Sequence, residues 1–114
     1  MNPNPSVQQL LQMLQDQHHA LYVKMGTVTD PNDGQKIMLE AQELLHRISI
    51  AQNFVLLAIT ANVTAAVAQV QSADQQLTAD LQESTDINAV VTKVTAYLGY
   101  VDQAIDFFKT VAAA

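Results

Sequence analysis

Residues 35–83 read QKIMLEAQELLHRISIAQNFVLLAITANVTAAVAQVQSADQQLTADLQE, and this stretch decides the fold. It contains neither Gly nor Pro, and it is rich in Ala, Leu, Gln and Glu, which are strong helix formers. Its apolar residues recur mostly at intervals of three and four, the period of an amphipathic helix. They are Ile37, Ala41, Leu44, Ile48, Ala51, Val55, Ile59, Val63, Val67, Val70, Leu77 and Leu81. The pattern predicts one helix over residues 35–83, about 70 Å long at 1.5 Å per residue.

A break in this helix is the alternative. Residues 72–75 (SADQ) fit a capping box, in which a Ser is followed three residues later by Gln, so a new helix can begin near Ser72. Nothing at that position forbids an α-helical backbone, and the pattern therefore favours a continuous helix slightly. A continuous helix gives the chain three long helices, whereas a break gives it four.

Two short clusters bound the long helix. Residues 29–34 (TDPNDG) precede it: Pro31 disfavours a helical residue before it, and Asp33-Gly34 predicts a tight turn. Residues 84–86 (STD) follow it, and all three are favourable residues at the N-cap of a helix. These clusters indicate where the chain reverses direction.

The segments on either side also have helical apolar periodicity. The sequence predicts a first helix at about residues 6–27, with Ser6 as its N-cap, and a last helix at about residues 86–111. No segment alternates apolar and polar residues for long enough to predict a β-strand. The expected fold is a single all-α domain, residues 1–114: an antiparallel bundle of three long helices, or of four if the middle helix is broken.

The helix lengths bear on whether the chain folds alone. If the middle helix is straight, the first helix packs along its front half and the last helix along its rear half. Each half is then only two helices thick and buries little surface, so we expect oligomerisation to complete the bundle. If the middle helix bends back, an ordinary four-helix bundle forms and a monomer is expected to be stable.

The composition argues against several classes of function. Five Lys and Arg against eleven Asp and Glu give a formal net charge of -6. This balance is unlike that of a nucleic-acid-binding protein, because Lys and Arg must neutralise phosphates there. It also argues against docking on anionic lipid through a basic patch. The chain has no Cys, which excludes disulfides, thiolate metal sites and cysteine nucleophiles.

No charged residue occurs in residues 48–73. This run is long enough to cross a bilayer, which takes about 20 residues, so membrane insertion is one alternative. Amides and hydroxyls interrupt the run, however, and no aromatic belt flanks it, so we favour burial against protein. Its many alanines permit close approach of another helix. The predicted interface residues are Ile48, Val55, Ala58, Ile59, Val63, Ala65, Val67 and Val70.

One group of residues has the spacing of a metal site. Glu43 and His46 form a Glu-x-x-His step, as in ferritin-like di-iron bundles. The further candidates are Glu40 in the same segment and Asp16, His18 and His19 in the first predicted helix. The pattern is incomplete, because the last helix supplies no second Glu-x-x-His and the first offers Asp in place of Glu. A metal-binding four-helix bundle is therefore an alternative only, and no residue is assigned as a metal ligand.

The remaining conspicuous side chains favour packing over chemistry. His18 falls on the apolar stripe of the first helix, where a partly buried imidazole with local partners is favoured over a pH-sensitive interface. Aromatic residues gather near the end of the chain, and we expect them in the core or an interface rather than around a ligand. They are Tyr97, Tyr100, Phe107 and Phe108.

Motifs of catalysis are missing from the sequence. There is no Gly-x-Ser-x-Gly, and three scattered glycines cannot form a phosphate-binding loop. We therefore expect a non-enzymatic helical interaction or assembly protein without a cofactor, which associates with itself or with a helical partner through its uncharged centre. No signal peptide is recognised, so a cytoplasmic location is the default and export by a signal-less route the alternative.

Overall fold

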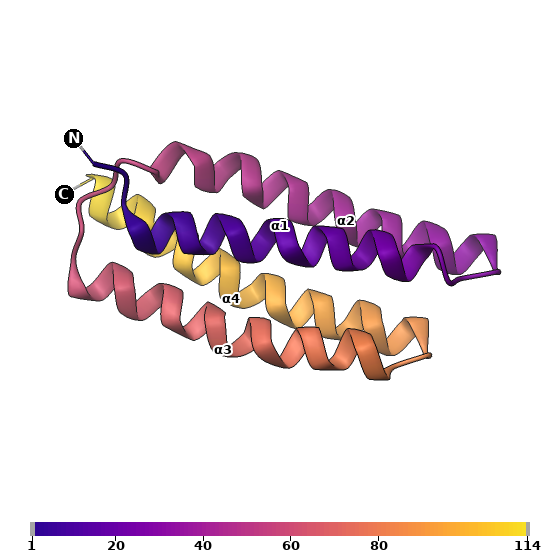
Figure 1. Cartoon of the computed structure of the whole chain (residues 1–114). Coiled ribbons are helices and arrows are strands. Elements are labelled where there is room, and N and C mark those ends of the chain that lie inside the picture. Colours follow the sequence, from indigo (N-terminus) through magenta and orange to yellow (C-terminus); the bar gives the residue numbers. More distant parts are fainter. Residues whose placement is uncertain (1, 114) are drawn as a thin grey trace.

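The computed structural model describes residues 2–113, which form four α-helices and no β-strand (Figure 1). The helices are α1 (Pro5–Met25), α2 (Pro31–Ala51), α3 (Ala61–Glu83) and α4 (Ile87–Ala113), with a single 3-10 turn, η1 (Gln52–Phe54), after α2. The prediction of an all-α helical bundle is confirmed.

The four helices are arranged as two antiparallel hairpins. α1 pairs with α2 and α3 pairs with α4, and the hairpins pack with α1 against α3 and α2 against α4. The chain passes from the first hairpin to the second at the end of the bundle where the described chain begins and ends (Figure 1). Consequently α1 runs parallel to α3, and α2 runs parallel to α4. The bundle measures 47 × 21 × 19 Å.

The prediction of a continuous helix over residues 35–83 is wrong, and so is the alternative break near Ser72. α2 ends at Ala51 and α3 begins at Ala61, so residues 52–60, the crossover segment, separate them. Ser72 lies inside α3. Folding back allows the apolar face of each half to pack on two neighbouring helices, which a straight helix cannot achieve within one chain.

One core runs through the bundle. Each helix contributes apolar residues at intervals of three or four to it, as the periodicity predicts. Its fully buried members include Leu10, Leu14 and Leu21 of α1, Ile37 and Leu44 of α2, Val63, Val67 and Val70 of α3, and Tyr97 and Phe108 of α4. Four helices surround this core. The arrangement only two helices thick, from which oligomerisation was expected, therefore does not occur.

The helix starts differ from the predicted ones at two places. Asn4, not Ser6, is the N-cap of α1, and Pro5 is its first residue. Asp30 caps α2 in the same way, so residues 31–34 form its first turn and Asp33-Gly34 is not a tight turn. In both cases a Pro follows the cap, where its fixed φ suits a helix and its missing N–H loses no hydrogen bond.

The other predicted boundary is correct. α3 ends at Glu83 and α4 begins at Ile87, on either side of residues 84–86. The carboxylate of Asp86 accepts a hydrogen bond from the backbone N–H of Asn88 at 3.0 Å, which is the capping contact expected there.

Asn4 fixes the crossover segment to the start of α1. Its Oδ1 accepts hydrogen bonds from the backbone N–H groups of Ser6 (2.9 Å) and Val7 (3.3 Å). Its Nδ2 donates to the carbonyl oxygens of Leu57 (3.0 Å) and Ala58 (3.1 Å). Asn4 is fully buried, and both its Oδ1 and its Nδ2 have the hydrogen-bond partners that a buried amide needs. The side chain therefore joins two segments that lie more than fifty residues apart.

Candidate functional site

The predicted interface residues divide between core and surface. Four are buried in the core of the bundle: Ile48, Val63, Val67 and Val70. Three of the other four lie in the crossover segment, where Val55 is half-buried and Ala58 and Ile59 are exposed. The fourth, Ala65, is exposed on α3. The buried four already pack within their own chain. An interface through the exposed residues stays a prediction.

The metal candidates are not brought together. Within residues 2–113 no three His, Asp or Glu side chains converge into a group able to hold a metal ion. Glu43 accepts a hydrogen bond from Arg47 at 2.6 Å, and Arg47 reaches across to both carboxylate oxygens of Asp102 at 2.9 and 3.0 Å. Glu43 therefore belongs to an ion-pair network between α2 and α4. Another metal candidate, His18, packs edge-on against Tyr22, with ring centroids 5.0 Å apart.

The crossover segment also divides the uncharged run that raised the alternative of membrane insertion. None of the helices within residues 2–113 has both the length and the apolarity that a bilayer crossing needs. Residues 48–73 contribute the last turn of α2, the crossover segment and the first half of α3.

A buried polar network, which the sequence analysis missed, joins three helices. Gln17 of α1 is buried, and its Nε2 donates hydrogen bonds to Asp74 Oδ1 at 3.0 Å and Thr78 Oγ1 at 2.9 Å. The hydroxyl of Tyr97 donates to the same Asp74 oxygen at 3.2 Å. Burial raises the pKa of Asp74, while the bonds from Gln17 and Tyr97 act in the opposite direction. Burial also raises the pKa of Tyr97, so its hydroxyl keeps its proton.

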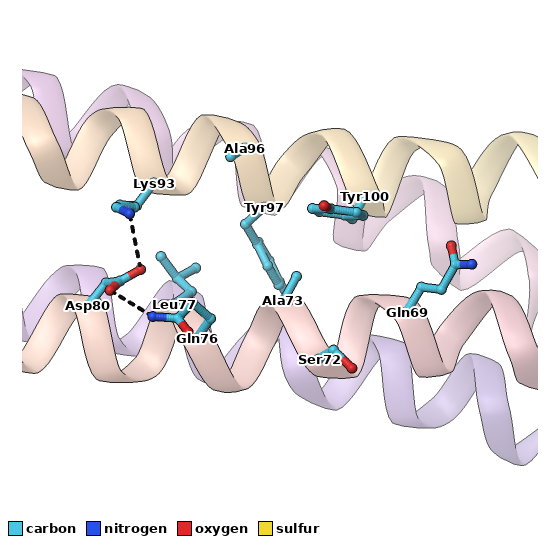
Figure 2. Close-up of a pocket in the computed structure, with 10 residues that line it drawn as sticks. All are labelled: Gln69, Ser72, Ala73, Gln76, Leu77, Asp80, Lys93, Ala96, Tyr97 and Tyr100. Carbon is cyan, nitrogen blue, oxygen red and sulfur yellow. Dashed lines mark hydrogen bonds and ion pairs between the residues drawn. The ribbon is translucent and has the colours of Figure 1, made fainter.

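Next to this network, a groove of about 510 Å³ runs between α3 and α4 (Figure 2). Small residues make room for it, and Tyr97 points across it toward α3. At one end Asp80 Oδ1 accepts a hydrogen bond from Gln76 at 3.1 Å, and Lys93 Nζ lies 3.9 Å from Asp80 Oδ2. The lining residues are Gln69, Ser72, Ala73, Gln76, Leu77 and Asp80 of α3 and Lys93, Ala96, Tyr97 and Tyr100 of α4.

A second, smaller groove of about 180 Å³ lies between α1 and α2. Three large apolar side chains stand exposed beside it: Tyr22 (55 %), Met38 (47 %) and Leu45 (49 %). His18 and Gln42 also line it, and no Asp, Glu, Lys or Arg is among the described residues that line it. We call these five residues the α1–α2 surface.

The uncharged character extends along both helices of this surface. Residues three or four apart share a helix face. Leu11 and Gln15 continue the face of His18 on α1, and Ser49 continues that of Leu45 on α2. This surface lies outside residues 48–73, where the interface was predicted. Met38 and Leu45, seven residues apart at the edge of the apolar stripe, were the available signal.

The aromatic side chains near the end of the chain do not form one patch. They are Tyr97, Tyr100, Phe107 and Phe108. Tyr97 and Phe108 are buried in the core, and Phe108 packs against Phe54 with ring centroids 5.9 Å apart. Tyr100 is exposed at the rim of the α3–α4 groove.

Comparison of the chain with protein families, with curated proteins and with solved structures finds no match.

Proposed function

We propose that this chain is a non-catalytic helical assembly protein that pairs with a second copy of itself through the α1–α2 surface. The supporting observation is the grouping of Tyr22, Met38 and Leu45 beside one uncharged groove. Exposed apolar side chains gathered in one place are typical of protein–protein contact surfaces, whereas scattered ones are ordinary. Burying this group against another protein removes apolar area from water and stabilises the complex.

The charge distribution restricts pairing with a second copy to an uncharged surface. Each chain carries a formal charge of -6, so two copies repel each other at long range. Contact through the five residues of the α1–α2 surface takes no Asp, Glu, Lys or Arg side chain out of water, so the large desolvation penalty of a charge does not oppose it. The seam between α2 and α4 is different, because Glu43, Arg47 and Asp102 lie along it.

The size of the surface argues against a very stable pair. α1 and α2 have 21 residues each, and the bundle is 21 Å wide. The outer face of the hairpin is therefore about 30 Å long and about 600 Å² in area, which is an upper limit for the contact. In a two-fold symmetric pair each surface meets its own copy, which buries at most about 1,200 Å² in total, near the lower limit for a specific interface. We therefore expect a dissociation constant in the micromolar range.

Sedimentation velocity across a dilution series from about 1 to 500 μM tests this proposal, because that range brackets micromolar pairing. Leu45→Glu places a carboxylate in the contact and is expected to weaken the pair by at least about tenfold. Leu39→Glu is the matched control, because Leu39 lies on the same helix, is 55 % exposed and does not line the groove. It is expected to leave pairing nearly unchanged.

Two results would contradict the proposal: a wild-type chain that stays monomeric at the highest concentration, or equal effects of the two Leu variants. Ala65→Glu separates the α1–α2 surface from the interface predicted on α3. If that variant dissociates the pair while Leu45→Glu does not, the contact lies on α3. Circular dichroism of each variant verifies that the helices are intact.

A further inference from the structure

The α3–α4 groove lies on the opposite side of the bundle from the α1–α2 surface. α1 packs on α3 and α2 packs on α4, so the two hairpins turn their outer faces in opposite directions. Pairing through the α1–α2 surface therefore leaves the groove open to solvent. Its volume, about 510 Å³, falls within the range of pockets that hold small molecules, roughly 300 to 1,000 Å³.

One end of the groove holds a carboxylate oxygen without a hydrogen bond. Asp80 Oδ1 accepts from Gln76, but Asp80 Oδ2 is buried and has no hydrogen-bond partner within the described residues. Its nearest cation is Lys93 Nζ, which at 3.9 Å is too distant to donate a hydrogen bond. A buried acceptor that has lost water without gaining a donor is unfavourable. This oxygen is therefore ready to accept an N–H donor.

Apart from Gln69, Ser72 and Gln76, the rest of the groove is apolar or aromatic. Leu77, Ala73 and Ala96 form apolar parts of its wall, and Tyr100 lies at the end away from Asp80 (Figure 2). Lys93 and Tyr100 are seven residues apart on α4, so the distance along the groove between the two ends is about 10 Å. Asp80 and Lys93 are the only charged residues among the described residues that line it.

We propose that the α3–α4 groove binds a small organic monocation, a protonated primary amine with an apolar body up to about 10 Å long. The ammonium donates a charge-assisted hydrogen bond to Asp80 Oδ2. The apolar body lies along Leu77 toward Tyr100, whose ring packs against it. The Lys93 side chain, which is 54 % exposed, moves into solvent as the ligand enters. Lys93 is thus an internal competitor for the carboxylate and not a ligand-binding residue.

Three probes with the same body test the charge preference: phenylbutylamine, phenylbutanol and phenylbutyrate, titrated into the full chain and followed by amide chemical shifts in NMR. The amine is expected to bind in the millimolar range, as is usual for so small a ligand, and to shift the signals of residues that line the groove. It should bind at least about fivefold more tightly than the alcohol, and the alcohol more tightly than the carboxylate. Phenylbutyrate binding as tightly as the amine, or no saturable shift with the amine, would overturn the proposal.

Substitution of Lys93 gives the sharper test, because the proposal predicts a gain of binding. Lys93→Met removes the competing ammonium and should strengthen amine binding severalfold relative to alcohol binding. Lys109→Met removes the same charge from the same helix outside the groove and reports the effect of net charge alone. If Lys93→Met strengthens the preference for the amine no more than Lys109→Met does, the assignment of Lys93 as a competitor is wrong and the proposal fails.

Asp80→Asn completes the test, since it removes the carboxylate that the amine is proposed to contact. The amine should then bind no more tightly than the alcohol, while alcohol binding stays within about twofold. An undiminished preference for the amine would refute the role of Asp80. If Asp80→Asn does not fold by circular dichroism, the paired Lys variants decide the question, because both side chains are mostly exposed.

Discussion

Asn4→Ala is expected to destabilise the bundle by more than the loss of a helix cap. Removing the Oδ1 that caps α1 costs about 1 kcal/mol, the usual effect of replacing an N-cap residue by Ala. The same truncation removes the two hydrogen bonds that Nδ2 donates to the carbonyl oxygens of Leu57 and Ala58. Each is worth about 0.5 to 1.5 kcal/mol in net stability. The expected total loss is therefore about 2 to 4 kcal/mol in the free energy of unfolding.

Asp30→Ala provides the matched control. Asp30 caps α2 through one hydrogen bond from the backbone N–H of Asn32, at 2.9 Å, and is exposed. Its removal should cost about 1 kcal/mol. Urea unfolding followed by circular dichroism gives the free energy of unfolding of each variant by linear extrapolation. Asn4→Ala should exceed Asp30→Ala by about 1 to 3 kcal/mol, the contribution of the bonds to the crossover segment.

Equal losses in the two variants would refute the reasoning, because the bonds to the crossover segment would then contribute nothing. Asn4→Asp tests the same contacts separately. It keeps the oxygen that caps α1 but replaces the Nδ2 donor by a second oxygen facing two carbonyl oxygens. We expect it to be at least as destabilising as Asn4→Ala, whereas a role limited to capping predicts a nearly neutral effect.

Three further predictions concern the interior and its polar contacts. Burial raises the pKa of Asp74 above its ordinary value of 3.8, so the folded state holds this proton more tightly and stability falls as pH rises from 3.8 through the folded-state pKa. Asp74→Asn should flatten that fall in urea midpoints measured across this range, and an unchanged slope would contradict the assignment. Arg47→Met removes the bidentate contact with Asp102. Because the pair is partly exposed, this should lower the free energy of unfolding in urea by about 1 kcal/mol, and by less in about 1 M NaCl. A loss independent of salt would argue against an ionic origin. Leu14→Ala should cost about 2 to 5 kcal/mol in the same assay, and a loss below about 1 kcal/mol would be inconsistent with its full burial.

Periodicity and capping residues predicted the helical class and the boundary at residues 84–86, because both depend on neighbours in the sequence. The break at residues 52–60 could not be predicted in the same way. That segment has no Gly or Pro, and its only local signal is Thr60, a residue suited to the N-cap of a helix. In the structure Thr60 caps α3 by accepting a hydrogen bond from the backbone N–H of Val63 at 3.1 Å. The break is stabilised by Asn4, which is distant in the sequence.

The buried polar residue and the candidate sites depend on which helices are neighbours. Gln17 has the spacing of a core residue, three after Leu14 and four before Leu21, but a Gln is placed there only when its donors have partners. Those partners, Asp74 and Thr78, come from α3. Each groove likewise needs two helices, so the apolar stripe of one helix predicts neither.

The division of the bundle into two hairpins has a consequence for how the chain can be taken apart. Each hairpin is continuous in sequence, and only the crossover segment connects them covalently. A peptide-bond cut beside the exposed Leu56 would give two fragments, each retaining both partners of one antiparallel pair. Because the shared core lies between the hairpins, separately produced fragments should recombine when mixed, and the cut chain should behave as a heterodimer.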